Sequence, residues 1–553
     1  MKKLLTLSVM FILCLLTFAT DFMRIKLKDG NIARYEVDNI EEVDFEIGKD
    51  TSIIGDTTAV DTSASPLRFR ITSGSTAEVS GYRYYYNNTD SIAIPEKVRI
   101  NGKIYNVTSI GDGVFGGYSG LTSIRIPESV TSIGAEAFIG CSDLTRINIP
   151  EGVTSIGYEA FYGCSGLTNT HITIPASVAR IDSGAFAGSN LKSIEISEGI
   201  TSITFGAFAG CDSLKNIKIP TSVTSIEGSA FSGCSSLTSI NIPEGVTSIG
   251  EYAFSRCSGL TSINIPEGVT SIGGGTFYDC SGLTNVKISE KVRRIGNSAF
   301  SGCSGLTSIN IPEGVTSIGE SAFSGCSGLT SINIPEGVTS IGGHAFSGCS
   351  GLTSINIPEG VTSIGSSPFE YCSSLTSINV ASNNPAYSSD NGILYNKDKT
   401  EIILAPQGIK GNILIPESVT SIGWYAFSGC SGLTSIQIPE GVTSIGSSAF
   451  SGCSGLTSIQ IPEGVTRIGS SAFSGCSGLT SINIPEGVTR IEGSAFSGCS
   501  SLTSINIPES VTSIGWYAFE YCSNLDVTID NSENNVTIEN NAFKGCKSVT
   551  YLK

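Results

Sequence analysis

Residues 303–325 read CSGLTSINIPEGVTSIGESAFSG, and close copies of this 23-residue unit tile the chain from about residue 107 to its end. The cysteines mark the period, because they recur every 23 residues from Cys211 to Cys372 and again from Cys430 to Cys522. A single unit of this length cannot bury its own apolar face, so neighbouring units must stack to form a common core. The period therefore predicts a repeat solenoid.

One unit shows how the chain turns within each coil. Ile332 and Ile334 are two residues apart and point to one face of a short strand, while the residues beside them point outward. The Pro-Glu-Gly segment 335–337 predicts a turn, because proline donates no ladder hydrogen bond and glycine accepts unusual dihedral angles. Residues 338–341 predict a second extended segment, and residues 345–349 return through a helical or irregular turn.

The Leu-x-x-Ile-x-Ile core within a period of 20–29 residues is typical of leucine-rich repeats. We therefore expect a β-rich leucine-rich-repeat stack of 23-residue units with a parallel sheet. Short helical or irregular turns would connect its strands, and a cap would cover each end.

The composition excludes several functional classes. Lys and Arg number 32 against 49 Asp and Glu, and the resulting net charge of −17 argues against a nucleic-acid binder. Hydrophobic residues make up 40% of the chain, which is enough to form a core. The two histidines, His171 and His344, lie in different units, and no Gly-x-Ser-x-Gly motif accompanies either. We expect no enzyme, no catalytic residues and no cofactor.

Sixteen cysteines follow Cys14, and they hold the same position in successive units. An exported protein rich in cysteine can carry a disulfide framework. Parallel inward side chains, however, do not offer the geometry that a disulfide needs, so we expect buried free thiols that act as small hydrophobic groups. Tyr118 and Ser189 take this position in two units. No Cys-x-x-Cys pair or histidine partner predicts a metal site.

Residues 1–19 predict a secretory signal peptide. Lys2 and Lys3 precede an apolar run that is too short for a confident membrane span, and cleavage is expected after Ala19. A lipid anchor on Cys14 is the competing interpretation. The residues before it, 11–13, lack the small side chain that lipoprotein processing needs. We expect a secreted or cell-surface protein with no transmembrane segment in the mature chain.

The rest of the chain divides by its patterns. Residues 20–48 predict a small β module, because Met23–Leu27 and Ile32–Val37 alternate around an Asp-Gly turn and Ile40–Phe45 follows. Residues 49–64 predict a linker and residues 65–106 an N-terminal cap. Residues 107–522 hold the repeats, and within them a long variant unit, 381–415, predicts a protruding hairpin. Residues 523–553 predict a degenerate C-terminal repeat or cap.

In a solenoid each repeat position becomes a column along the surface. The outward strand position holds a polar amide in most units, and this face is a candidate for contact with a protein or glycan, or is the solvated side of a sheet. Exposed aromatic pairs on the loops after Ile-Gly are candidate contact anchors or tolerated variation. The candidate contact residues are Asn241, Asn264, Asn310, Asn333, Asn356, Asn379, Trp424, Tyr425, Trp516 and Tyr517.

A column of glutamates follows the strand proline. It accounts for much of the net negative charge. One interpretation is an acidic ridge that attracts calcium or a basic partner, and the other is a solvated turn that keeps the stack soluble. Its members are Glu128, Glu151, Glu244, Glu267, Glu313, Glu336, Glu359, Glu417, Glu440, Glu463, Glu486 and Glu509.

These units resemble the BspA-type leucine-rich repeats of bacterial surface proteins, especially those of Bacteroidetes. The resemblance rests on LTSINIPEGVTSIGxxAFSGC, on the opening unit Ile104–Gly111 and on the variant segment Asn384–Tyr395, and it covers about residues 65–553. It implies adhesion, the binding of extracellular-matrix proteins and of host or neighbouring cells. It implies no catalytic residues.

Two functions remain open from the sequence. The favoured one is an exported cell-surface adhesin or protein-binding scaffold whose partners are proteins or glycoproteins. The alternative is a structural or self-associating protein that forms a surface layer or stalk without a specific ligand.

Overall fold

The computed structural model describes residues 22–26, 32–36, 60–61, 65–83, 91–168 and 171–553. The chain divides into two compact units, residues 1–57 and residues 58–553. The predicted signal peptide, Cys14, the segment Ile40–Phe45 and most of the predicted linker lie outside the described residues. The elements of the described residues are β-strands joined by turns, and no helix is present among them.

The first unit contains one strand pair. β1 (Phe22–Lys26) pairs antiparallel with β2 (Ile32–Glu36), and Arg24 lies opposite Arg34. The two strands predicted for this segment are therefore confirmed to within one residue at each end.

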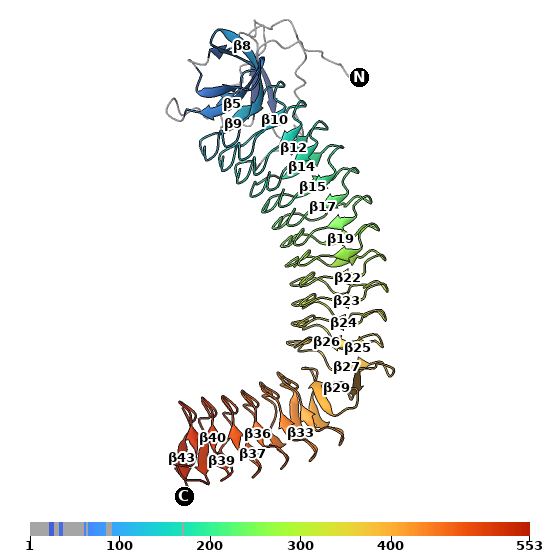
Figure 1. Ribbon diagram of the computed structural model, residues 1–553, viewed down its shortest axis with the longest axis vertical. Helices are drawn as coiled ribbons and strands as arrows, with labels where there is room; N and C mark the ends of the chain where they lie inside the picture. Colours follow the sequence, from blue (N-terminus) through green and yellow to red (C-terminus); the bar gives the residue numbers. More distant parts are fainter. Residues whose placement is uncertain (1–21, 27–31, 37–59, 62–64, 84–90, 169–170) are drawn as a thin grey trace. The chain divides into compact units, whose positions relative to one another are not determined.

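Each coil of the second unit contributes two short straight segments joined by a turn (Figure 1). In the coil that begins at Cys349, β25 (Ser354–Ile357) buries Ile355 and Ile357 and exposes Ser354 and Asn356. This is the alternation of a strand with one face in the core. After the Pro-Glu-Gly turn, β26 (Ser363–Ile364) begins the second segment. The remaining part of each described coil consists of turns, so of the two forms predicted there the irregular one is observed.

Strands at the same place in successive coils form two rows, and within each row most neighbouring strands pair in parallel. The Ser-Ile row comprises β10 (Ser132–Ile133), β11 (Ser155–Ile156), β13 (Arg180–Ile181), β15 (Ser202–Ile203), β17 (Ser225–Ile226), β18 (Ser248–Ile249), β20 (Ser271–Ile272), β22 (Arg294–Ile295), β23 (Ser317–Ile318), β24 (Ser340–Ile341), β26, β30 (Glu401–Leu404), β32 (Ser421–Ile422), β34 (Ser444–Ile445), β36 (Arg467–Ile468), β38 (Arg490–Ile491), β40 (Ser513–Ile514) and β42 (Thr537–Ile538).

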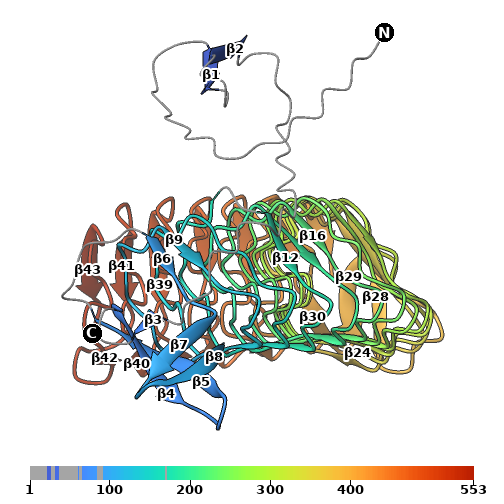
Figure 2. The same cartoon turned by 90° about the horizontal axis from the view of Figure 1, so that it is seen from above.

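The Asn row comprises β9 (Ser123–Arg125), β12 (His171–Ile174), β14 (Ser193–Ile196), β16 (Asn216–Lys218), β19 (Ser262–Asn264), β21 (Asn285–Lys287), β25, β27 (Ser377–Val380), β31 (Gly411–Leu414), β33 (Leu433–Gln437), β35 (Ser458–Gln460), β37 (Ser481–Asn483), β39 (Ser504–Ile507), β41 (Asp526–Ile529) and β43 (Ser548–Tyr551). Viewed along the stack, β12 and β16 of this row lie on the opposite side of the coils from β24 of the Ser-Ile row (Figure 2). The two rows therefore present separate surfaces.

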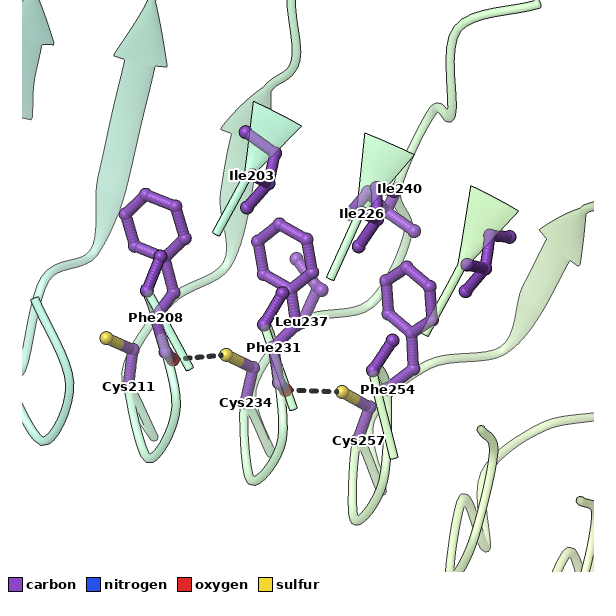
Figure 3. Packing of buried hydrophobic residues seen from close by; sticks show 14 of the residues in the cluster. Ile203, Phe208, Cys211, Ile226, Phe231, Cys234, Leu237, Ile240, Phe254 and Cys257 are labelled. Atoms are coloured by element: carbon purple, nitrogen blue, oxygen red, sulfur yellow. Dashed lines mark hydrogen bonds between the residues drawn. The ribbon is translucent and has the colours of Figure 1, made fainter. Parts of the chain in front are cut away.

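A column of phenylalanines fills the core. The rings stack from Phe115 to Phe369 and again from Phe427 to Phe543, with centroids 5.1–5.7 Å apart and planes within 17° of parallel. Figure 3 shows the rings of Phe208, Phe231 and Phe254 side by side. Offset stacking at this separation is favourable beyond the burial of apolar area, so the column holds each coil to the next.

The cysteines form a second column beside the rings. All sixteen described cysteines are free, and all but Cys546 are buried, which confirms the prediction of buried thiols. Apart from Cys430, whose Sγ donates to the carbonyl oxygen of Pro406, each Sγ donates to the carbonyl oxygen of the phenylalanine one coil earlier. Cys234 donates to Phe208 and Cys257 to Phe231, at 3.2 and 3.1 Å (Figure 3). The same carbonyl also accepts the backbone N–H of the cysteine in its own coil, as Phe208 does from Cys211 at 3.2 Å, so the thiol adds a second hydrogen bond that joins adjacent coils.

Burial makes these thiols unreactive. Desolvation raises the pKa of Cys211 and Cys280 to about 12, and the thiolate is the reactive form. At pH 8 we expect the disulfide reagent DTNB to react with at most about one thiol per folded chain, the partly exposed Cys546, and with all sixteen described cysteines after unfolding in guanidinium. Absorbance at 412 nm measures both stoichiometries, and reaction of many thiols in the folded chain would contradict the buried column.

Extra strands cover the first coil. They are β3 (Val60–Asp61), β4 (Leu67–Ile71), β5 (Thr76–Tyr82), β6 (Ser91–Ala93), β7 (Lys97–Ile100) and β8 (Lys103–Ile110). β8 pairs with β10, β5 pairs with β8, and β4 takes the outer edge antiparallel to β5. Arg68 and Arg70 are exposed on that edge strand, where charge opposes edge-to-edge association. β3 pairs with β7, so the last part of the predicted linker joins these strands.

The long unit is not a protruding hairpin. β28 (Tyr387–Asp390), β29 (Ile393–Asn396) and β30 form an antiparallel meander, and β30 then pairs in parallel with β32. Ile393, Leu394 and Tyr395 are all at most 1% exposed. Leu394 packs in the core cluster of the earlier coils, and Ile393 and Tyr395 pack in that of the later coils. β29 is therefore buried on both faces and separates the two clusters.

At the other end, residues 523–553 continue both rows. β41 pairs with β39, β43 with β41, and β42 with β40. The degenerate sequence therefore keeps the strand register of the repeats.

Candidate binding surface

The outward position of the Asn row carries a column of exposed amides. Strand alternation turns these side chains to solvent because the isoleucines on either side are buried, as Ile332 and Ile334 are around Asn333. Every predicted asparagine of this column is exposed: Asn241, Asn264, Asn310, Asn333, Asn356 and Asn379. The same holds for Asn148, Gln437, Gln460, Asn483 and Asn506.

Most of these amides keep their hydrogen-bonding groups free. Asn379 Nδ2 donates to Asn356 Oδ1 at 3.1 Å, and Asn379 also accepts from Ser377, but the other amides of the column have no partner within the part of the chain that the structure describes. The neighbouring threonines differ, since Thr457 Oγ1 donates to the carbonyl oxygen of Thr434 at 3.1 Å. Such threonine hydroxyls form hydrogen bonds between adjacent coils, whereas the unpartnered amides are available to a ligand.

Several coils carry another residue at this position, and two of these departures change the chemistry of the column most. Lys218 Nζ lies 2.6 Å from Glu195 Oε1, and this pairing lowers the pKa of the Glu195 carboxyl. Leu414 pairs with Gln437 in the register and is 65% exposed, an apolar side chain among amides. Sequence reasoning missed Leu414, although counting back 23 residues from Gln437 reaches it.

The two aromatic pairs lie on turns that follow the Ser-Ile row. Trp424 is 76% exposed and Trp516 is 59% exposed, and the tyrosines after them, Tyr425 and Tyr517, are also exposed. Because the turns belong to the other side of the coil, the structure does not bring these aromatics together with the Asn row. The predicted contact residues form two surfaces rather than one.

Every member of the glutamate column is exposed. Across the described residues, no group of three or more histidine, cysteine, aspartate or glutamate side chains is placed to hold a metal ion. The column therefore forms an acidic edge of exposed carboxylates.

The two histidines are surface groups in different coils. His171 Nδ1 lies 2.9 Å from Ser193 Oγ, and its Nε2 lies 3.8 Å from Glu195 Oε2. These serine, histidine and glutamate side chains lie on an open face, where the histidine side chain is 56% exposed. The Glu195 carboxylate already forms an ion pair with Lys218. Such exposure does not provide the water-excluded site that charge stabilisation in catalysis uses. His344 lies 3.7 Å from Glu370 in another coil.

In the described part of the chain, no helix has the length and apolar character needed to cross a bilayer. A comparison with curated proteins finds no match.

Solved structures of bacterial leucine-rich-repeat proteins are similar to the chain, and two of them cover most of it. A leucine-rich cell surface protein from Faecalibacterium prausnitzii A2-165 is 29% identical, and the match covers 86% of this chain and 96% of that one with a TM-score of 0.44. A leucine-rich repeat protein from Bacteroides ovatus is 28% identical, and the match covers 88% of this chain and 99% of that one with a TM-score of 0.42.

The family model of the BspA-type leucine-rich-repeat region matches six copies over residues 77–211, 169–284, 270–391 and 409–526. These segments cover well over half of the 553 residues, and the family is defined by its repeat rather than by a catalytic activity. The chain belongs to the BspA-type leucine-rich-repeat family.

Proposed function

We propose that this protein is an exported scaffold that binds other proteins at the cell surface and acts as an adhesin toward extracellular-matrix proteins or neighbouring cells. The observation that carries the proposal is the column of exposed amides without partners on the Asn row. Family membership supports it, as do the predicted signal peptide and the similarity to a protein described as a cell surface protein.

The physical basis is repetition of weak contacts. A hydrogen bond exchanged with water contributes about 0.5–1.5 kcal/mol net, so one amide confers little affinity. Amides at the same place in successive coils give an extended partner many such contacts at once. The near identity of the coils disfavours a single shaped pocket on this face, because a pocket needs different groups that converge.

Binding of the purified protein to immobilised fibronectin, fibrinogen and intact epithelial cells tests the proposal. Light scattering after size-exclusion chromatography is run on the same sample. We expect saturable binding by a monomer. Absence of binding to all three surfaces by a protein whose size grows with concentration would contradict it.

The second candidate function is a self-associating surface scaffold, and one observation favours it. Within the described residues, β43 pairs only with β41, and Val549 on it is 38% exposed. A strand with one unpaired edge can accept a strand from another molecule. Growth of the particle with concentration in the same light-scattering experiment would select this function.

A further inference from the structure

The long unit leaves a gap in the Ser-Ile side of the stack. Ile402 pairs with Ile422, and the backbone N–H of Ala405 donates to the carbonyl of Ala426 at 2.6 Å. In the next coil Phe427 makes the equivalent bond, to the carbonyl of Ala449. Ala405 thus stands where other coils have phenylalanine. It follows its strand isoleucine by three residues instead of five, so the turn of this coil is two residues shorter than those of its neighbours.

The short turn opens a pocket between the flanking turns. The cavity has a volume of about 420 Å³ and lies between residues 365–368 of the preceding coil and residues 423–425 of the following one. We call it the junction pocket. The residues that decide its chemistry are Pro368, Glu401, Ile403, Leu404, Trp424 and Tyr425.

Most of the pocket wall is apolar, and its charge has one sign. Ile403 and Leu404 are partly exposed beside the shortened turn. Glu401 lies at the outward position of β30 beside Ser421, and no lysine, arginine or histidine lines the pocket. Among the described residues no cation forms an ion pair with Glu401, whose carboxylate is therefore available.

The carboxylate lies close to the tryptophan turn. A Cβ placed on Gly423 would be 3.5 Å from Glu401 Oε1, and one placed on Gly446 would be 2.7 Å from Trp424 Cδ1. The two glycines leave room for the carboxylate and for the indole. Both groups thus border the same cavity.

The second tryptophan differs in one respect. Trp516 Nε1 donates to Glu539 Oε2 from the next coil. The residue 23 positions after Trp424 is Ser447, and in the described structure the indole N–H of Trp424 has no acceptor. The indole N–H of Trp424 is therefore available to a ligand, whereas that of Trp516 is already bonded. Because the two side chains hold equivalent positions in their coils, Trp516 is the matched control for Trp424.

We propose that the junction pocket binds a basic, apolar segment of a partner protein, with a lysine or arginine side chain between Glu401 and the ring of Trp424. A carboxylate and an indole face attract such a cation together, and its aliphatic stem suits Ile403 and Leu404. A fully hydroxylated sugar would leave the aliphatic wall unmatched. The net charge of −17 also attracts a basic partner. This site is distinct from the Asn row and does not depend on it.

The two tryptophans make the binding measurable. In a Trp516→Phe protein, Trp424 is the only remaining indole. The probes are acetyl-Leu-Arg-Leu-Arg-Leu-amide, its glutamine counterpart acetyl-Leu-Gln-Leu-Gln-Leu-amide, and the neutral sugar cellohexaose. We expect the arginine peptide to change the Trp424 emission saturably, and the glutamine peptide to bind at least about tenfold more weakly.

Anisotropy of a fluorescein-labelled arginine peptide then compares variants. Glu401→Gln should weaken binding about tenfold and Trp424→Ala should weaken it further, while Trp516→Ala should leave it unchanged. Circular dichroism checks that each variant is folded. Equal loss in Trp424→Ala and Trp516→Ala, no loss in Glu401→Gln, or tighter binding of the glutamine peptide or cellohexaose would overturn the proposal. Alanine variants of the Asn row should bind the peptide normally, which separates this test from that of the proposed function.

Discussion

Phe473→Ala should lower the free energy of unfolding of the stack by about 3–5 kcal/mol, the usual cost of removing a buried phenylalanine side chain. Phe473 is 0% exposed, and its ring stacks on Phe450 at 5.4 Å and on Phe496 at 5.3 Å. The change therefore removes two ring contacts and leaves a cavity between adjacent coils. Urea denaturation followed by far-ultraviolet circular dichroism measures the loss.

Ser474→Ala is the matched control, because this serine is adjacent in the chain and only partly buried. Its effect should stay within about 0.5 kcal/mol. A loss below about 1 kcal/mol for Phe473→Ala would mean that the ring column does not hold the coils together.

Asn384→Ala should destabilise the junction between the two core clusters by about 3–4 kcal/mol, because it removes four hydrogen bonds to backbone groups, two of them to buried carbonyls. Asn384 is 0% exposed. Its Nδ2 donates to the carbonyls of Pro358 and Val361, both at 2.8 Å, and its Oδ1 accepts from the backbone N–H groups of Ala386 and Tyr387 at 2.9 and 2.8 Å. The side chain thus ties the long unit to the preceding coil.

Limited proteolysis with thermolysin measures this effect locally, and cleavage within residues 381–415 should accelerate in the variant. The neighbouring Asn383 is exposed, so Asn383→Ala controls for the loss of an asparagine at this point in the chain. Equal cleavage rates in the two variants would refute the role assigned to Asn384.

The regular part of the fold follows from the 23-residue period. The alternation of Ile355, Asn356 and Ile357 sets which side chains are buried, and the repeated cysteine position correctly predicts free thiols. The hydrogen bonds from the thiols to phenylalanine carbonyls were not predictable in the same way, because they depend on how the backbone of one coil lies against the next.

The structure of the long unit and the presence of the junction pocket could not be predicted from the sequence. The apolar run Ile393–Tyr395 looks like one strand of a hairpin, and only the pairing of its neighbours places one of its faces in each core cluster. The junction pocket arises from a turn that lacks two residues. That deletion becomes visible only when the pairing of Ile402 with Ile422 fixes the register across the irregular segment.

The most direct test of the central claim compares the two rows of the same coils. The triple variant Asn310→Ala, Asn333→Ala and Asn356→Ala removes amides from the Asn row. The control, Ser317→Ala, Ser340→Ala and Ser363→Ala, changes the Ser-Ile row instead.

Binding to the extracellular-matrix protein or cells that the unmodified protein recognises is measured for both variants. Three hydrogen bonds at about 1 kcal/mol each predict a loss of affinity of at least about tenfold for the asparagine variant and no loss for the serine variant. Unchanged binding by the asparagine variant, or an equal loss in the serine variant, would contradict a binding surface on the Asn row.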